Sequence, residues 1–141
     1  MREVILRAYD KDSKKMVQVV SYHMASYGCC EQDYITACDM NEDYTAEVVE
    51  TQLCFNFSLN EYTGYVDSKG KKIFEGDIVK YRENTFAPEV VGKVVFANGC
   101  WFVDYNFPHC ISQYLHTAHQ SKYIPIEVIG NIYENIDLLE V

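Results

Sequence analysis

Four residues in the last third of the chain are of types that commonly bind metal ions in proteins: His109, Cys110, His116 and His119. A loop could present the thiol and the imidazoles together, and His116 and His119 would share a face if their segment is helical. The spacing matches no closed zinc pattern, and no Cys-x-x-Cys pair occurs. We therefore predict no metal and no other cofactor. A metal-dependent enzyme or module using the segment 109–119 stays an alternative.

Glu75 and Asp77 are the second set of residues that could take part in catalysis, since two carboxylates can serve as a general acid and a general base. Gly76 between them indicates a turn instead, which Asp77 can hold by accepting backbone N–H groups. The chain also lacks a Gly-rich phosphate loop, a Gly-x-Ser-x-Gly motif and a His-Glu-x-x-His motif. We expect no catalytic residues and predict that the protein is not an enzyme.

The residues around this pair indicate strands separated by tight turns. Gly64, Gly70 and Gly76 are evenly spaced, as expected where the backbone needs a positive φ angle. The sequence at 67–70 predicts a turn that joins two strands into a hairpin with a bulge. The next strand, 78–82, has one face of mixed polarity, which predicts a position near a sheet edge.

Three blocks of the sequence resemble the YopX-like proteins of bacteriophages and prophages. They are the opening residues 1–10, the turn-rich stretch 62–81 and the closing stretch 127–135. Their turn residues, which we interpret as structural, are Thr63, Gly64, Gly70, Glu75, Gly76, Asp77, Gly130 and Asn131. The resemblance implies a phage- or prophage-derived accessory protein of unknown biochemical role, with an SH3-like β-barrel in its second half and no catalytic residues to assign.

A β-hairpin is predicted between residues 93 and 104, because two apolar runs flank Asn98-Gly99, the favoured type I′ turn. This turn pairs Val95 with Phe102 and makes both faces of the hairpin apolar. Such a hairpin is either covered by the N-terminal lobe or contacts another chain. We predict a possible protein-binding face that includes Val95, Trp101 and Phe102, with a protein partner or a second copy of the chain.

The remaining pattern predicts a mainly β fold with little helix. Residues 1–61 should form an N-terminal lobe, and residues 62–141 the barrel, the two packed together as one unit. A hairpin is predicted over residues 4–22, whereas the pattern weakens from 23 to 60. Within that stretch, residues 43–49 fit either a short helix or a strand. A late strand at 124–133 should be kinked at Gly130.

Charge and composition narrow the class of partner. The 141 residues include 12 basic and 21 acidic side chains, for a net charge of −9, which argues against nucleic-acid binding. The acidic stretch 31–50 could instead imitate the phosphates of DNA, so an acidic decoy is another alternative. With no secretory signal or membrane span in the sequence, we predict a cytoplasmic protein with reduced cysteines.

Overall fold

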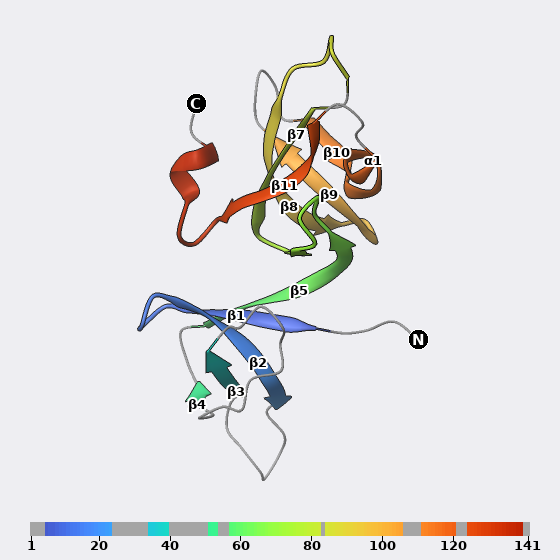
Figure 1. Cartoon of the computed structure of the whole chain (residues 1–141). Helices are drawn as coiled ribbons and strands as arrows, with labels where there is room; N and C mark the ends of the chain where they lie inside the picture. Colours follow the sequence, from blue (N-terminus) through green and yellow to red (C-terminus); the bar gives the residue numbers. More distant parts are fainter. Residues whose placement is uncertain are drawn as a thin grey trace. The chain divides into compact units, whose positions relative to one another are not determined.

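The structure, a computed structural model, describes residues 5–23, 34–39, 51–53, 57–82, 84–105, 111–120 and 124–139. The described part is mainly antiparallel β, with one short α-helix and one 3-10 helix (Figure 1). The chain divides into two compact units, Met1–Glu61 and Tyr62–Val141. The division falls between the two residues where we expected the lobe to end and the barrel to begin. None of the described helices is both long and apolar enough to cross a membrane.

The first unit is an antiparallel sheet in the order β4-β3-β2-β1-β5. Its strands are β1 (Leu6–Asp10), β2 (Lys15–His23), β3 (Tyr34–Asp39), β4 (Thr51–Leu53) and the first part of β5 (Phe57–Val66). β1 and β2 form the predicted N-terminal hairpin. Its small core is the fully buried Ala8, against which Val17, Val19, Phe57 and Leu59 pack. Residues 43–49, which fitted a helix or a strand, lie outside the described residues.

The turn of this first hairpin is held by Asp10. Its carboxylate accepts hydrogen bonds from the Asp12 amide at 3.0 Å and from the Ser13 hydroxyl at 2.6 Å. The Ser13 hydrogen bond holds the pKa of Asp10 below its ordinary value. Lys14, with a φ of 57°, completes the reversal.

The second unit contains an antiparallel sheet in the order β10-β9-β8-β7-β11 (Figure 1). Its elements are β6 (Lys72–Phe74), β7 (Asp77–Arg82), β8 (Val90–Ala97), β9 (Cys100–Tyr105), β10 (Ile111–Tyr114), α1 (Leu115–His119), β11 (Ile124–Asn131) and η1 (Ile136–Leu139). The end of β5 pairs with β6. The buried core joins β6, β7, β8, β9 and β11 to the helix; its members are Ile73, Val79, Tyr81, Val94, Val103, Leu115, Ala118 and Ile126, with Tyr65 from β5 packed against them.

One expectation about this unit was wrong. The mixed polarity of the face that carries Ile78, Lys80 and Arg82 predicts a position near a sheet edge for the strand 78–82. The structure pairs β7 with β8 on one side and β11 on the other, so it is an interior strand. Ile78 is fully buried, whereas Lys80 is half-buried and lies 3.7 Å from the Glu127 carboxylate. The mixed face therefore reflects an ion pair within the sheet and not an edge.

Candidate protein-interaction site

The β8–β9 hairpin has the register predicted from the Asn98-Gly99 turn. Its paired residues are Lys93 with Asp104, Val94 with Val103, Val95 with Phe102, Phe96 with Trp101, and Ala97 with Cys100. Asn98 and Gly99 both have positive φ angles, 52° and 78°, as a type I′ turn requires. The hairpin therefore presents two faces whose residues are fixed by the alternation of the strands.

The face of the hairpin that includes Val94 and Val103 is directed into the core. Both valines are fully buried, and the half-buried Trp101 packs against the same cluster. Towards the turn this face becomes exposed: Phe96 is 51% exposed and meets Trp101 edge-on, with ring centroids 4.9 Å apart. Trp101 consequently lies on the opposite face from Val95 and Phe102, so the three residues predicted as one binding face do not form one.

The second face carries Val95 and Phe102, which lie opposite each other on β8 and β9 and are half-buried. Tyr114, at the end of β10, pairs with Phe102 in register, and the two rings stack with centroids 4.8 Å apart. Tyr114 is 56% exposed. We call Val95, Phe102 and Tyr114 the aromatic face. Sequence reasoning missed Tyr114, because a four-residue strand is too short for its alternation to be recognised.

His116 and His119, the two histidines of the metal-dependent alternative that the structure describes, both contact their own chain. They lie on α1, as the helical spacing required, while Leu115 and Ala118 of the same helix are buried. His116 Nδ1 lies 3.0 Å from the Tyr65 hydroxyl. His119 Nε2 lies 3.1 Å from the Val66 carbonyl oxygen, and because a carbonyl only accepts, Nε2 donates.

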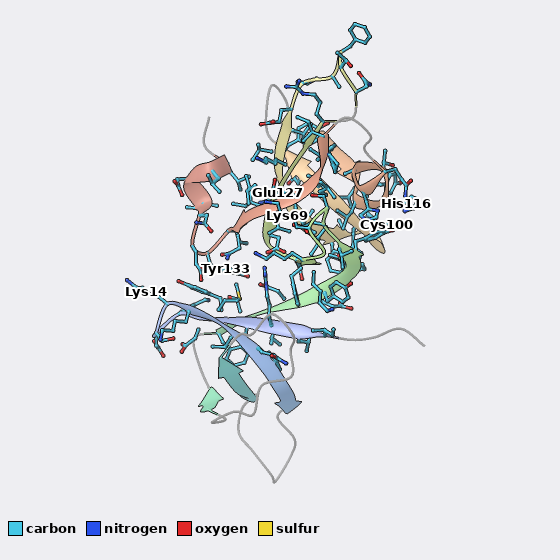
Figure 2. All side chains as sticks on the ribbon, viewed as in Figure 1. Lys14, Lys69, Cys100, His116, Glu127 and Tyr133 are labelled. Atoms are coloured by element: carbon cyan, nitrogen blue, oxygen red, sulfur yellow. The ribbon has the colours of Figure 1, made fainter. Side chains whose placement is uncertain are left out.

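Tyr65 is the common partner of these histidines, since its ring centroid lies 5.0 Å from that of His119 and 6.0 Å from that of His116. Figure 2 labels His116 at the surface of α1. His109 and Cys110 lie outside the described residues. In the part of the chain that is described, no three metal-binding side chains gather. The histidines therefore attach α1 to the end of β5.

Asp67 accepts hydrogen bonds from three backbone amides at the turn of the turn-rich stretch. Its Oδ1 accepts from the Lys69 and Lys71 amides at 2.9 and 2.8 Å, and its Oδ2 accepts from the Val128 amide at 3.1 Å. The side chain is only 6% exposed. The Gly70 amide donates to the Asp67 carbonyl at 3.0 Å, which closes the predicted turn. One carboxylate thus organises this turn and attaches it to β11.

Two other polar residues of this stretch, Thr63 and Asp77, also bind the backbone. The Asp77 carboxylate is buried and accepts from the Phe74 amide at 2.8 Å, as predicted for the turn at Glu75-Gly76. The Thr63 hydroxyl donates to the Ile73 carbonyl at 2.7 Å. Gly64, Gly70 and Gly76 have φ angles of 90°, 82° and 83°, which other residues adopt only with strain.

The closing block contains a second structural turn. The Asn131 side chain accepts from the Tyr133 and Glu134 amides, both at 3.0 Å. The register of β11 shifts between Val128 and Gly130, which is the predicted kink. A Cβ atom on Gly130 would lie 2.6 Å from Asn135 Oδ1, so glycine is needed here for close approach.

An exposed ion pair joins the Asp67 turn to β11 a second time. Lys69 Nζ lies 2.7 Å from the Glu127 carboxylate (Figure 2). The hydrogen bond from Lys69 lowers the pKa of Glu127, and that to Glu127 raises the pKa of Lys69. Both groups are charged at neutral pH.

Two solved structures share this architecture over almost their whole length. Protein EF1440 from Enterococcus faecalis has a TM-score of 0.65 and 22% identity, with 99% of this chain and 100% of that chain covered. YopX from Bacillus subtilis has a TM-score of 0.57 and 19% identity, with 96% and 98% covered. At these identities the likeness shows the fold.

The family follows from the sequence match. The family model described as YopX protein matches residues 6–140, and the chain belongs to the YopX protein family. No curated protein matches the chain. The resemblance drawn from the three sequence blocks is confirmed.

Proposed function

We propose that this YopX family protein is a phage- or prophage-derived accessory protein that binds another protein, or a second copy of itself, and catalyses no reaction. We further propose that its second unit is an SH3-like barrel and that it acts in the host cytoplasm. Membrane association and nucleic-acid binding are not part of this proposal, because the net charge of −9 opposes both anionic lipids and phosphates.

The aromatic face is the observation that carries the proposal. Phe102 and Tyr114 stack on each other, yet Tyr114 leaves more than half of its surface in water. Aromatic side chains are enriched at the centres of protein interfaces, because they bury a large area and lose little conformational entropy. Val95 extends the apolar surface on the next strand, so a partner would bury a continuous patch.

Strand order supports the barrel. β7, β8, β9 and β10 follow one another as neighbours, and β11 then returns to pair with β7. In an SH3-like barrel a meander is likewise closed by a last strand that returns to the first. Side chains from β6 and α1 complete the core on one side of this sheet, and the interior of a small closed barrel is likewise filled with side chains.

Affinity capture from a host-cell lysate tests the proposed function. The tagged wild type should retain a protein that the Tyr114→Ala variant fails to retain. Ile136→Ala is the matched control, because Ile136 is a similarly exposed apolar residue on η1. Capture that is equal for the wild type and both variants, or no capture at all, would contradict the proposal.

The metal-dependent alternative is tested separately. We expect the purified protein to hold no stoichiometric zinc, because the spacing of His109, Cys110, His116 and His119 matches no closed zinc pattern. Elemental analysis measures this directly. One tightly held equivalent that is lost in the His116→Ala, His119→Ala double variant would favour a metal site in the segment 109–119.

The acidic-decoy alternative rests on the stretch 31–50, whose side chains lie outside those that the structure describes. Salt-sensitive capture of DNA-binding proteins would favour it.

A further inference from the structure

The two edges of the second-unit sheet differ in how their backbone groups are used. At the β11 edge, the Ile126 carbonyl accepts from the Ser68 amide at 2.9 Å, and the Val128 amide donates to Asp67 at 3.1 Å. Pro125 in the same strand has no N–H to offer. Natural sheets block their edges in such ways, because an open edge pairs with other chains. The β11 edge is therefore closed to an added strand.

The opposite edge is β10, which pairs with β9 alone among the strands that the structure describes. The direction of its backbone groups follows from the hairpin. Residues that flank a two-residue turn exchange hydrogen bonds, and bonded pairs then alternate along the ladder. Ala97 and Cys100 are such a pair, so Phe102 also bonds to β8. Val103 is left to bond to β10.

Val103 pairs in register with Gln113, so the backbone groups of Gln113 are directed towards β9. Its neighbours Ser112 and Tyr114 consequently direct their N–H groups to the outer edge. The carbonyl of Ser112 is directed there too. The carbonyl of Tyr114 is not available to a partner, because Tyr114 is the N-cap of α1 and an N-cap carbonyl accepts the first hydrogen bond of the helix. The edge thus offers two donors and one acceptor next to the exposed Tyr114 ring.

We propose that β10 receives an extended segment of a partner protein as an added β-strand. This inference rests on the proposed function and specifies how the aromatic face is used. Strand addition supplies affinity through main-chain hydrogen bonds and specificity through alternate side chains. The aromatic face would contact those side chains.

The register also specifies the chemistry of the partner segment. A residue opposite Tyr114 would lie beside the stacked Phe102–Tyr114 rings, where aromatic and β-branched side chains pair best. The residue two positions away would lie opposite Ser112, in the row that contains Asp104 on β9. In that row Asp104 lies between Ser112 and Lys93, so the charged residue nearest to the added position is acidic. Together with the net charge of −9, it favours a lysine or arginine there, and an acidic segment should bind more weakly.

A display experiment with two variants tests this inference. A yeast-displayed library of random linear peptides is selected on the full chain, and the recovered peptides are measured against Ser112→Pro and Ser112→Ala. Proline removes the outward N–H and is tolerated at a sheet edge, whereas alanine keeps the N–H. We expect peptides with alternating apolar and basic residues that bind Ser112→Pro about tenfold more weakly and Ser112→Ala as tightly as the wild type.

Amide hydrogen exchange of the wild type gives an independent readout if the proline variant does not fold. Bound peptide should slow exchange at Ser112 and Tyr114, whose amides are directed outwards, with little change at Gln113. A library that yields no such peptide, or peptides that leave the Ser112 and Tyr114 amides unprotected, would overturn the inference. Peptides that need Tyr114 but bind Ser112→Pro normally would also overturn it, while leaving the proposed protein-binding function intact.

Discussion

The turn-rich stretch 62–81 and the β8–β9 hairpin with its neighbour β10 differ in what their polar and aromatic side chains contact. In the turn-rich stretch, Asp67 and Asp77 are almost completely buried and their carboxylates bind backbone amides. At the outer end of the hairpin and on the adjoining β10, Phe96 and Tyr114 leave half or more of their surface in water. The buried carboxylates of the turn-rich stretch maintain the fold, whereas the exposed rings leave surface that a partner could contact.

This difference shows where to look for function in such a chain. Three backbone amides bind the nearly buried Asp67 carboxylate, so this side chain serves the fold. The stacked rings of Phe102 and Tyr114 cover each other only in part, because neither the core nor another described strand covers Tyr114. Mutations in the two regions should therefore separate folding from association.

The largest effect is expected for Asp67→Ala. Three backbone amides lose their acceptor in a mostly buried site, so the free energy of unfolding should fall by about 3 to 5 kcal/mol. Urea unfolding followed by Trp101 fluorescence measures this. Asp67→Asn is the matched control, because its amide keeps one acceptor oxygen for the turn and should lose less stability than alanine. Unchanged stability of the alanine variant would mean that the turn does not need its carboxylate.

Gly99→Val should have the next largest effect. The new side chain meets no neighbour within 4 Å, so the loss comes from the positive φ of 78°. A β-branched residue in that conformation should lower stability by roughly 1 to 3 kcal/mol. Gly99→Asn is the control, because asparagine tolerates this region and should lose much less. Equal thermal unfolding of both variants and the wild type would argue against the type I′ turn.

Gly130→Ala should destabilise by about 1 to 2 kcal/mol, because its Cβ atom would overlap Asn135. The overlap involves a side chain, so a second change can remove it. In a double-mutant cycle, Asn135→Gly should recover part of the loss caused by Gly130→Ala. Strictly additive effects would show that the contact between these two residues is not the cause.

The smallest effect concerns pH and the ion pair between Lys69 and Glu127. The Lys69 hydrogen bond lowers the pKa of Glu127 in the folded protein, so the pair stabilises the fold above the ordinary value of 4.5. That contribution should disappear as the pH falls through the lowered pKa. Lys69→Met should therefore flatten the acid dependence of the melting temperature slightly. An unchanged acid profile would show that solvent screening leaves the pair without effect.

The turns and the hairpin could be predicted from sequence for a physical reason. Asn98-Gly99 admits few backbone conformations, and a two-residue turn fixes every later pair of the hairpin. Gly64, Gly70 and Gly76 likewise mark positions where only glycine is unstrained. Constraints of this kind depend only on neighbouring residues, so they can be recognised in the sequence.

Features that depend on distant partners could not be predicted. The burial of β7 between two strands is decided by β11, which follows much later in the chain and also supplies Glu127 for Lys80. Tyr114 joins the aromatic face only because β10 pairs with β9. Trp101 and Val95 lie on opposite faces because side chains alternate along a strand. The contact of Trp101 with the core, however, depends on residues from the whole second unit. Sequence patterns record such long-range contacts only weakly.

Sedimentation velocity of the wild type and of Tyr114→Ala tests the central claim most directly, that the aromatic face serves association and not folding. The wild type, alone or with the captured protein, should sediment as a complex. Tyr114→Ala should lose no more than about 1 kcal/mol of stability, since Tyr114 is mostly exposed, and should sediment as a folded monomer. A wild type that stays monomeric with every captured protein, or a variant that associates as the wild type does, would contradict the claim.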